Sequence, residues 1–290
     1  MVLCILFAAP ASASGETMID VVQIGLGFVL SIVIGGVAFA RRSLSESGWL
    51  GAVLVGTLTF GFGGWAWGIT LIVFFVSSSL LSHYKESIKE RRAAEKFAKG
   101  GRRDFFQTIA NGGLGALCAV AYALNDQPAV LLAAFVGLMA TVTADTWATE
   151  LGVLSPHEPR LITTRQPVPP GTSGGVTLMG TSAAAAGGLL IGITMFLLSS
   201  IGGTPPWWMI PAGLLGGLGG ALLDSLMGAT VQAIYVYPDG RETERRVARD
   251  GTPNRFLRGW RWMDNDLVNL ISSIGGALIA VVIAALMGVL

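Results

Sequence analysis

Long apolar runs alternate with short polar segments along most of the chain. Six of these runs are about the length that crosses a bilayer as a helix: 19–40, 105–124, 129–151, 176–201, 209–229 and 266–290. The run 49–82 is too long for one crossing, and its glycine-rich stretch 61–64 predicts a tight turn between two short helices. The pattern therefore predicts an all-α, polytopic membrane protein of about eight transmembrane helices.

Composition agrees with a membrane protein. Hydrophobic residues make up 52% of the 290 residues and charged residues only 13%, against about 25% charged in soluble domains. The forty glycines suit close helix packing in lipid, and some also suit loops that approach a ligand. A net charge of +1 gives no reason to expect a nucleic-acid partner. Cys4 and Cys118 both lie in apolar runs and offer neither a disulfide framework nor a zinc site.

The domain organisation follows from the same pattern. Residues 15–290 are expected to form a single membrane-embedded domain. Residues 1–14 are apolar and end in small residues like a signal peptide, but they lack its positive start. They are either a cleaved signal or a short hydrophobic extension.

Basic residues set the expected orientation. Arg41 and Arg42 directly follow the first run, and the segment 83–103 is the most basic loop of the chain. Both lie on the same side of the membrane if 49–82 is a hairpin. The positive-inside rule places them in the cytoplasm and the N-terminus outside.

Polar motifs interrupt the apolar runs at five places, and each falls at a cytoplasmic helix end under this orientation. The orientation was derived from Lys and Arg alone. The positions of the polar motifs played no part in it, so their gathering on one side is independent evidence for a site there. We expect a polar site at the cytoplasmic face, formed by Asn111-Gly112-Gly113, Asp145 with Thr146 and Glu150, Gly171 to Gly175, Asp224-Ser225 with Gln232, and Asp264 to Asp266 with Asn269.

The acidic motifs are candidates for metal binding. Mg²⁺ takes one or two protein carboxylates together with substrate phosphates. Asp145 and Glu150 are five residues apart, so a straight helix turns them away from each other. Glu150 can reach the same site if the helix ends near Ala148. The alternatives are an interhelical hydrogen bond of a protonated Asp145, a helix cap at Asp264, and first-turn dipole stabilisation by Asp266.

The glycine-rich motifs are candidates for phosphate binding. The segment 171–175 precedes a helix, where successive N–H groups and the helix dipole favour anions. Thr172 and Ser173 would either cap that helix or contact phosphate. Asn111-Gly112-Gly113, near the start of another helix, would do similar work. The alternative for both motifs is a helix cap and a close packing point.

Basic residues near these motifs differ in what they suggest. Arg165 lies between the acids and the glycine motif, where it is placed to assist phosphate binding. The basic residues of 99–103 are better explained by topology than by ligand contact. The segment 241–249 alternates in charge and is expected to be a solvated face.

The expected site points to phosphoryl transfer on a lipid, because it combines carboxylates, amides and glycine-rich helix starts at one membrane face. Catalysis of this reaction is mostly positioning and charge neutralisation. The chain lacks the GxxxxGK[ST] sequence of a P-loop kinase. The main alternative is a transporter of an anionic lipid or small solute, and a blander one is a membrane scaffold with helix caps only. A transporter should place its site near the midplane on broken helices, so acids gathered at one face favour the enzyme.

Taken in order, the motifs resemble a known family of integral membrane proteins that includes transmembrane protein 19 and the plant phytyl-phosphate kinase. The similarity covers about Arg41 to the C-terminus. It is carried by Arg103-Asp104 through Gln107 to Gly113, ADTWATELGVLS from Ala144, Pro159 to Thr164, Pro169 to Val176, DSLMGATVQ from Asp224, and DNDLVN from Asp264.

The resemblance, which extends more distantly to CTP-using dolichol and phytol kinases and lipid cytidylyltransferases, implies a specific reaction. It implies transfer of a phosphoryl group from CTP or another NTP to a phytyl or other prenyl monophosphate, with Mg²⁺. The expected partners are the bilayer, the isoprenoid phosphate and the nucleotide. It implies catalytic roles for Asp145, Glu150, Asp224 and Asp266, of which Asp145, Asp224 and Asp266 would hold metal. Phosphate-binding roles would fall to Asn111, Gly112, Gly113, Arg165, Thr172, Ser173, Gly174, Gly175 and Asn269.

Overall fold

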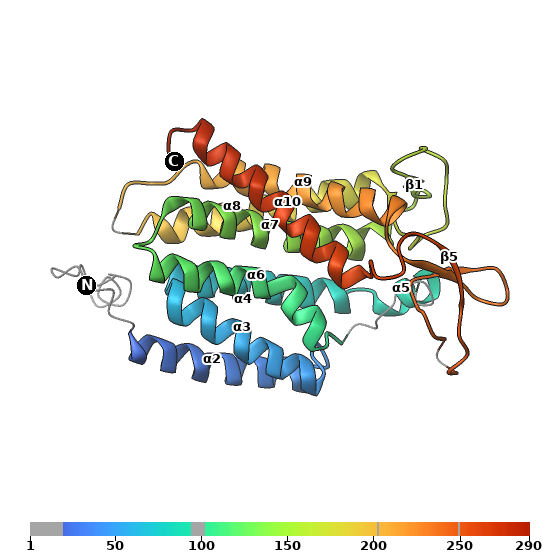
Figure 1. Cartoon of the computed structure of the whole chain (residues 1–290), viewed down its shortest axis with the longest axis horizontal. Coiled ribbons are helices and arrows are strands. Elements are labelled where there is room, and N and C mark those ends of the chain that lie inside the picture. Colours follow the sequence, from blue (N-terminus) through green and yellow to red (C-terminus); the bar gives the residue numbers. More distant parts are fainter. Residues whose placement is uncertain (1–19, 94–101, 202, 249) are drawn as a thin grey trace.

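The computed structural model describes residues 20–93, 102–201, 203–248 and 250–290. The signal-like extension expected at 1–14 lies outside the described residues. Eight helices of 18 to 24 residues run along the long axis of the described part (Figure 1). They are α2 Val21–Ala40, α3 Glu46–Gly63, α4 Trp65–His83, α6 Phe105–Leu124, α7 Ala129–Gly152, α8 Leu178–Ser199, α9 Met209–Thr230 and α10 Asn265–Leu286.

Membrane crossing is supported for most of these helices. Within the described residues, six are long and apolar enough to span a bilayer by length and composition: α2, α4, α7, α8, α9 and α10. The predicted helical membrane fold is thus confirmed. That α3 and α6 also cross, for a total of eight spans, stays a prediction.

The expected hairpin is present at its expected turn. α3 ends at Gly63 and α4 begins at Trp65, and the linking Gly64 has a φ of +79° that favours glycine. The two helices have 18 and 19 residues and are longer than expected. The reason is that α3 starts at Glu46, where the Ser45 side chain accepts a hydrogen bond from the Gly48 backbone N–H (3.1 Å).

α7 is the central helix of the bundle and packs against α6, α8, α9 and α10. Its residues 135–144 are all buried, and Phe135 stacks on Trp67 of α4 with ring centroids 4.0 Å apart. Glycines let these helices approach closely. A Cβ on Gly137 would lie 2.5 Å from the carbonyl oxygen of Gly276, and one on Gly188 would lie 2.6 Å from that of Gly213. The close-packing interpretation of these glycines is confirmed.

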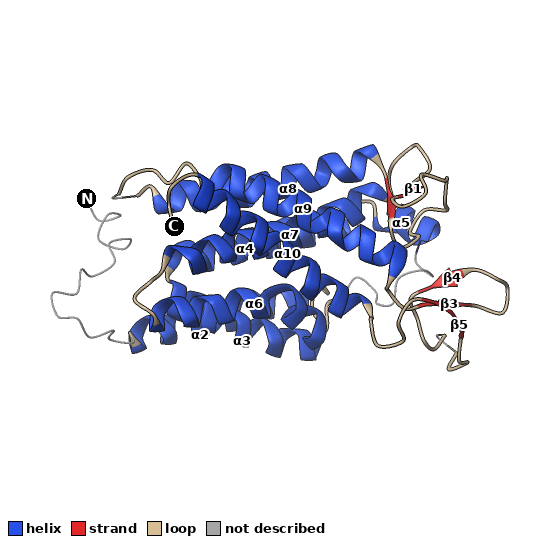
Figure 2. Ribbon diagram, turned by 45° about the horizontal axis from the view of Figure 1, so that its top comes forward, coloured by secondary structure: helices blue, strands red, loops and turns tan. Residues whose placement is uncertain are grey.

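The two ends of the bundle differ. One end carries the short turns between α3 and α4 and between α6 and α7, together with the start of α9 (Figure 1). The other, here called the loop-rich end, carries the short helix α5 (Glu86–Ala93) and the strands (Figure 2). β1 (Arg160–Leu161) pairs with β2 (Gly175–Val176), and β3 (Ile234–Val236) lies between β4 (Glu242–Thr243) and β5 (Arg255–Arg258). All pairs are antiparallel.

The strands were not expected, because 155–175 and 231–263 had been interpreted as polar loops. Strands of two to four residues are too short to show a period of two in the sequence. Residues next to the strands, among them Gly174 and Glu244, line the cavity described below.

Candidate functional site

A cavity of about 490 Å³ lies at the loop-rich end, between the ends of α6 to α10 and the loops beyond them. All five polar motifs contribute to its wall. Their convergence is therefore confirmed, while their chemical roles stay predictions. The lining residues from the motifs are Asn111, Asp145, Thr146, Glu150, Gly171, Thr172, Ser173, Gly174, Gly175, Asp224, Ser225, Gln232, Asp264, Asn265, Asp266 and Asn269.

Asp145 is the acid most available to a ligand. It follows directly on the buried stretch 135–144 of α7, at the point where the cavity begins. Its carboxylate forms no hydrogen bond with any described residue. The negative charges of Asp224 and Glu244 lie near enough to interact with it electrostatically. Like charges held together repel, so this group of acids favours a cation between them.

Asp224 is held in place by α10. Ser272 Oγ donates a hydrogen bond to Asp224 Oδ2 (3.1 Å). The Asn269 side-chain amide, in the orientation that suits its neighbours, donates to the same oxygen (3.0 Å). Among the described residues, none donates to Oδ1. Asn269 thus orients an acid, and that acid keeps one oxygen for a ligand.

Glu150 has partners of its own. α7 runs to Gly152, close to the end expected from the run 129–151, so the early helix end near Ala148 that would swing Glu150 back towards Asp145 is not present. Glu150 reaches the cavity wall, but it accepts a hydrogen bond from Ser82 Oγ (2.6 Å) and forms an ion pair with Lys89 of α5. Lys89 lies 61 residues earlier in the chain, so the sequence alone did not reveal this pair. The Glu150 carboxylate thus links α7 to α4 and α5, and these contacts compete with metal binding.

The glycine-rich loop lines the cavity but does not cap the helix after it. α8 starts at Leu178, and its N-cap is Thr177, whose side chain accepts from the Gly180 N–H (2.9 Å). Ser173 Oγ instead donates to Glu244 Oε1 (2.8 Å), and Thr172 Oγ1 donates to the Pro169 carbonyl (2.7 Å). The interpretation of Thr172 and Ser173 as helix caps is wrong. Both residues still line the cavity.

Gly174 shows why this loop needs glycine. Its φ is +82°, and a Cβ there would lie 2.5 Å from the backbone nitrogen of Ala229 at the end of α9. The absence of a side chain at Gly174 lets the loop pack directly against α9. The loop backbone thereby lies at the edge of the cavity.

Glu244 is a site residue that the sequence did not indicate. It belongs to the segment 241–249, for which a solvated face was expected. Glu244 Oε1 accepts from Ser173 Oγ and from Gln232 Nε2 (3.0 Å), and the residue lines the cavity. The two-residue strand β4 directly before it turns it inward, and a strand this short leaves no periodic signal.

Three predicted phosphate ligands lie outside the cavity wall. α6 starts at Phe105 with a capping box formed by Asp104 and Gln107, so residues 112 and 113 lie inside the helix. Amides beyond the first turn bond within the helix and form no anion nest. Gly112 packs instead against Val55, and Gly113 faces Ile109 of its own helix. Arg165 is exposed in the turn after β1, with a φ of +59°.

Arg103 is a basic residue of the cavity wall, although the sequence favours a topological role for it over ligand contact. One guanidinium nitrogen, Nη1, donates to Ser79 Oγ (3.1 Å). Burial lowers the pKa of Arg103, and the nearby negative charge of Glu150 partly offsets this effect. A guanidinium holds its proton very strongly, so the group stays charged. The described cavity wall carries only Arg103 and Lys89 against eight acids: Glu86, Glu90, Asp145, Glu150, Asp224, Glu244, Asp264 and Asp266.

The acids fit a metal–phosphate complex better than a metal cage. Among the described residues, no group of three or more His, Cys, Asp and Glu side chains is placed to hold a metal ion. Mg²⁺ does not need such a group, since it binds through one or two carboxylates, waters and phosphate oxygens. Asp145 and Asp224 both line the cavity and would be the carboxylates of such a site.

The fold and this site define an integral membrane protein with a polar cavity at one end of its helical bundle. The chain belongs to the family described as Integral membrane protein DUF92, which it matches over residues 29–277. The match covers nearly all the long helices and all five polar motifs.

Curated relatives come from a plant, an archaeon and a cyanobacterium. The chain is 34% identical over 264 residues to Protein PGR of Arabidopsis thaliana, covering 84% of this chain and 90% of PGR. It is 29% identical to the uncharacterized membrane protein MJ0933 of Methanocaldococcus jannaschii, over 92% of this chain and 97% of the relative. It is also 29% identical to Protein VTE6, chloroplastic, of Arabidopsis thaliana, over 87% of this chain and 68% of VTE6. No solved structure matches the chain significantly.

Proposed function

We propose that the protein is a membrane-embedded phosphotransferase. It moves a phosphoryl group from CTP or another NTP to an isoprenoid monophosphate, such as phytyl or another prenyl phosphate. The main support is the cavity at the loop-rich end, where Asp145 and Asp224 face a glycine-rich loop at the end of an apolar bundle. The resemblance of these motifs to the phytyl-phosphate kinase family supports the same reaction.

The reaction makes modest demands on the protein. A non-bridging oxygen of the acceptor phosphate attacks the γ-phosphorus of the nucleotide. The bond from that phosphorus to the β–γ bridging oxygen breaks, and the nucleoside diphosphate leaves. A phosphate monoester is already largely ionised at neutral pH, with a second pKa of about 6, so no general base is required. The protein has to bring two anions together and offset their charge.

The residues of the cavity suit that task. Asp145 and Asp224 would hold Mg²⁺, with Asp266 close by and Asn269 orienting Asp224. When bound, Mg²⁺ neutralises phosphate charge and orients the phosphate oxygens. Thr172, Ser173 and the glycines around them would contact the nucleotide phosphates, and Asn111 would contact the acceptor. Because the wall is strongly acidic, a nucleotide would enter as its metal complex.

The loop-rich end would face the cytoplasm, with the start of α2 outside. Arg41, Arg42 and the bases of α5 all lie at the loop-rich end of the described bundle. Under the positive-inside rule this orientation gives the cavity access to cytoplasmic nucleotides.

The test is direct. Purified protein in detergent with Mg²⁺ is incubated with farnesyl, geranylgeranyl and phytyl phosphates against a panel of NTPs. We expect the prenyl diphosphate and a stoichiometric nucleoside diphosphate for at least one pair. If no pair reacts but proteoliposomes take up an anionic lipid or solute, the transporter is correct and the kinase is not.

A further inference from the structure

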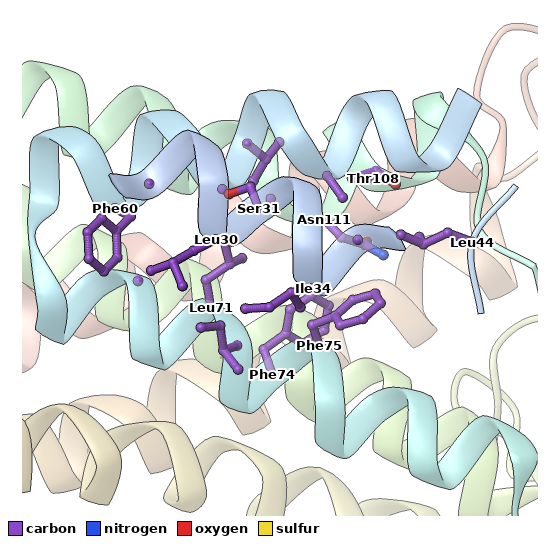
Figure 3. A pocket seen from close by; sticks show the side chains of 18 of the residues that line it. Leu30, Ser31, Ile34, Leu44, Phe60, Leu71, Phe74, Phe75, Thr108 and Asn111 are labelled. Carbon is purple, nitrogen blue, oxygen red and sulfur yellow. The ribbon is translucent and has the colours of Figure 1, made fainter. Parts of the chain in front are cut away.

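A second cavity lies between α2, α3, α4 and α6. It measures about 90 Å³ and is lined mainly by apolar side chains (Figure 3). Leu30 and Ile34 of α2 face Leu71, Phe74 and Phe75 of α4 across it. We call it the apolar pocket. All of its lining residues are buried or partly buried.

The apolar pocket adjoins the polar cavity. Arg103 and Asn111 line both spaces. Asn111 lies toward the Leu44 end of the pocket, the end nearest the loops (Figure 3). A molecule occupying both spaces would have an apolar part between α2 and α4 and a polar part beside Arg103 and Asn111.

Arg103 marks this junction as suited to an anion. Its guanidinium contacts Ser79 Oγ and lies 5.7 Å from the ring centre of Phe75. The nearby carboxylate of Glu150 forms its ion pair with Lys89, and no carboxylate among the described residues forms an ion pair with Arg103. A partly buried arginine without a carboxylate partner is costly unless an anion joins it. The planar guanidinium of arginine can also donate two parallel hydrogen bonds to a pair of phosphate oxygens.

We propose that the apolar pocket binds the hydrocarbon chain of the phosphate acceptor, while Arg103 and Asn111 bind its phosphate. The chemistry required is a linear apolar chain bearing a monophosphate. Its identification as an isoprenoid monophosphate rests on the proposed function. α2 packs on α3 at the edge of the bundle and few of its residues are buried, so the acceptor would reach the pocket from the bilayer.

Photolabelling tests the site without requiring turnover. A geranylgeranyl monophosphate with a diazirine at the far end of its chain is crosslinked to the full-length protein, and the labelled peptides are mapped. We expect label on α2 and α4, lost with excess geranylgeranyl phosphate. Label concentrated on α8 or α9, or no label at saturating probe, overturns the proposal. If phosphatidic acid reduces labelling as strongly as geranylgeranyl phosphate does, the occupant is a glycerolipid phosphate and the isoprenoid assignment is wrong.

A matched pair of variants tests the pocket itself. Ile34→Trp fills it, whereas Val33→Trp places the same side chain on the next residue, which is 57% exposed. We expect Ile34→Trp to reduce labelling and to raise KM for geranylgeranyl phosphate by about 10- to 100-fold, because overpacking expels the chain. KM for isopentenyl phosphate should stay within about twofold. Equal effects on both substrates, or of both variants, contradict the proposal.

The two proposals fail in different ways. Label on α2 and α4 without any diphosphate product refutes the kinase and keeps the pocket. Diphosphate production with label elsewhere refutes the pocket and keeps the kinase.

Discussion

Asp145→Asn is the substitution with the clearest expected outcome. Asparagine has nearly the same shape as aspartate but lacks its negative charge. Since Asp145 forms no hydrogen bond with a described residue, the substitution breaks none there. It would remove one of the two carboxylates that the proposed function assigns to the metal–phosphate complex.

The expected effects on stability and turnover have opposite signs. Two like charges 4 Å apart repel by about 1 kcal/mol in water and by about 4 kcal/mol at an effective dielectric constant of about 20. Neutralising Asp145 relieves part of its repulsion with Asp224 and Glu244, so the melting temperature should stay equal or rise. Loss of one electrostatic contact to the transition state should lower kcat by about 10²- to 10³-fold.

The assay measures kcat and the melting temperature on the same detergent-purified samples. The matched control is Asp126→Asn, the same change at an exposed position in the turn between α6 and α7, at the opposite end of the bundle. Asp126 has a φ of +55°, which asparagine tolerates well, and the control should keep wild-type turnover. Full turnover in Asp145→Asn, or loss of turnover only alongside a lowered melting temperature, would refute the reasoning.

Two further predictions concern the walls of the site. Glu150→Gln should lower stability by about 1–3 kcal/mol, because it breaks the ion pair with Lys89; a double-mutant cycle in thermal unfolding with Lys89→Met should show coupling, and strict additivity would argue against the pair. Gly174→Ala should weaken nucleotide binding in equilibrium titrations, because its Cβ meets the backbone of Ala229. Gly240→Ala, at a φ of +86° in open space, shares the strained backbone without the contact and should bind normally; equal effects of the two variants would assign the loss to backbone strain alone.

The sequence predicts the bundle well because membrane helices can be recognised from the length and hydropathy of their apolar runs. The tight turn at Gly64 and the convergence of the five polar motifs were both expected from local residues and from the distribution of Lys and Arg. A bilayer leaves few alternatives for such runs, since every backbone polar group in it must be satisfied within a helix.

Side-chain pairing between distant segments was not predictable in the same way. The partner of Glu150 is Lys89, and the partner of Ser173 is Glu244, 71 residues later. No periodic pattern in the sequence links the two residues of either pair. The start of α6 at Phe105 was expected, but it places Gly112 and Gly113 two turns inside the helix, and this removes their amides from consideration as an anion site.

The pocket shared by α2, α3, α4 and α6 shows a further limit. Its residues look like ordinary helix-packing positions in the sequence. Only their three-dimensional arrangement brings an apolar space against Arg103 and Asn111.

The measurement that tests the central claim most directly follows the γ-phosphoryl group of the nucleotide. CTP and ATP, radiolabelled at the γ-phosphorus, are incubated with the purified protein, Mg²⁺ and a prenyl monophosphate, and the lipid products are separated. The account predicts that label enters the terminal phosphoryl group of a prenyl diphosphate, and that Asp145→Asn strongly reduces this transfer. Label that stays in the nucleotide, or appears only as inorganic phosphate, would contradict it.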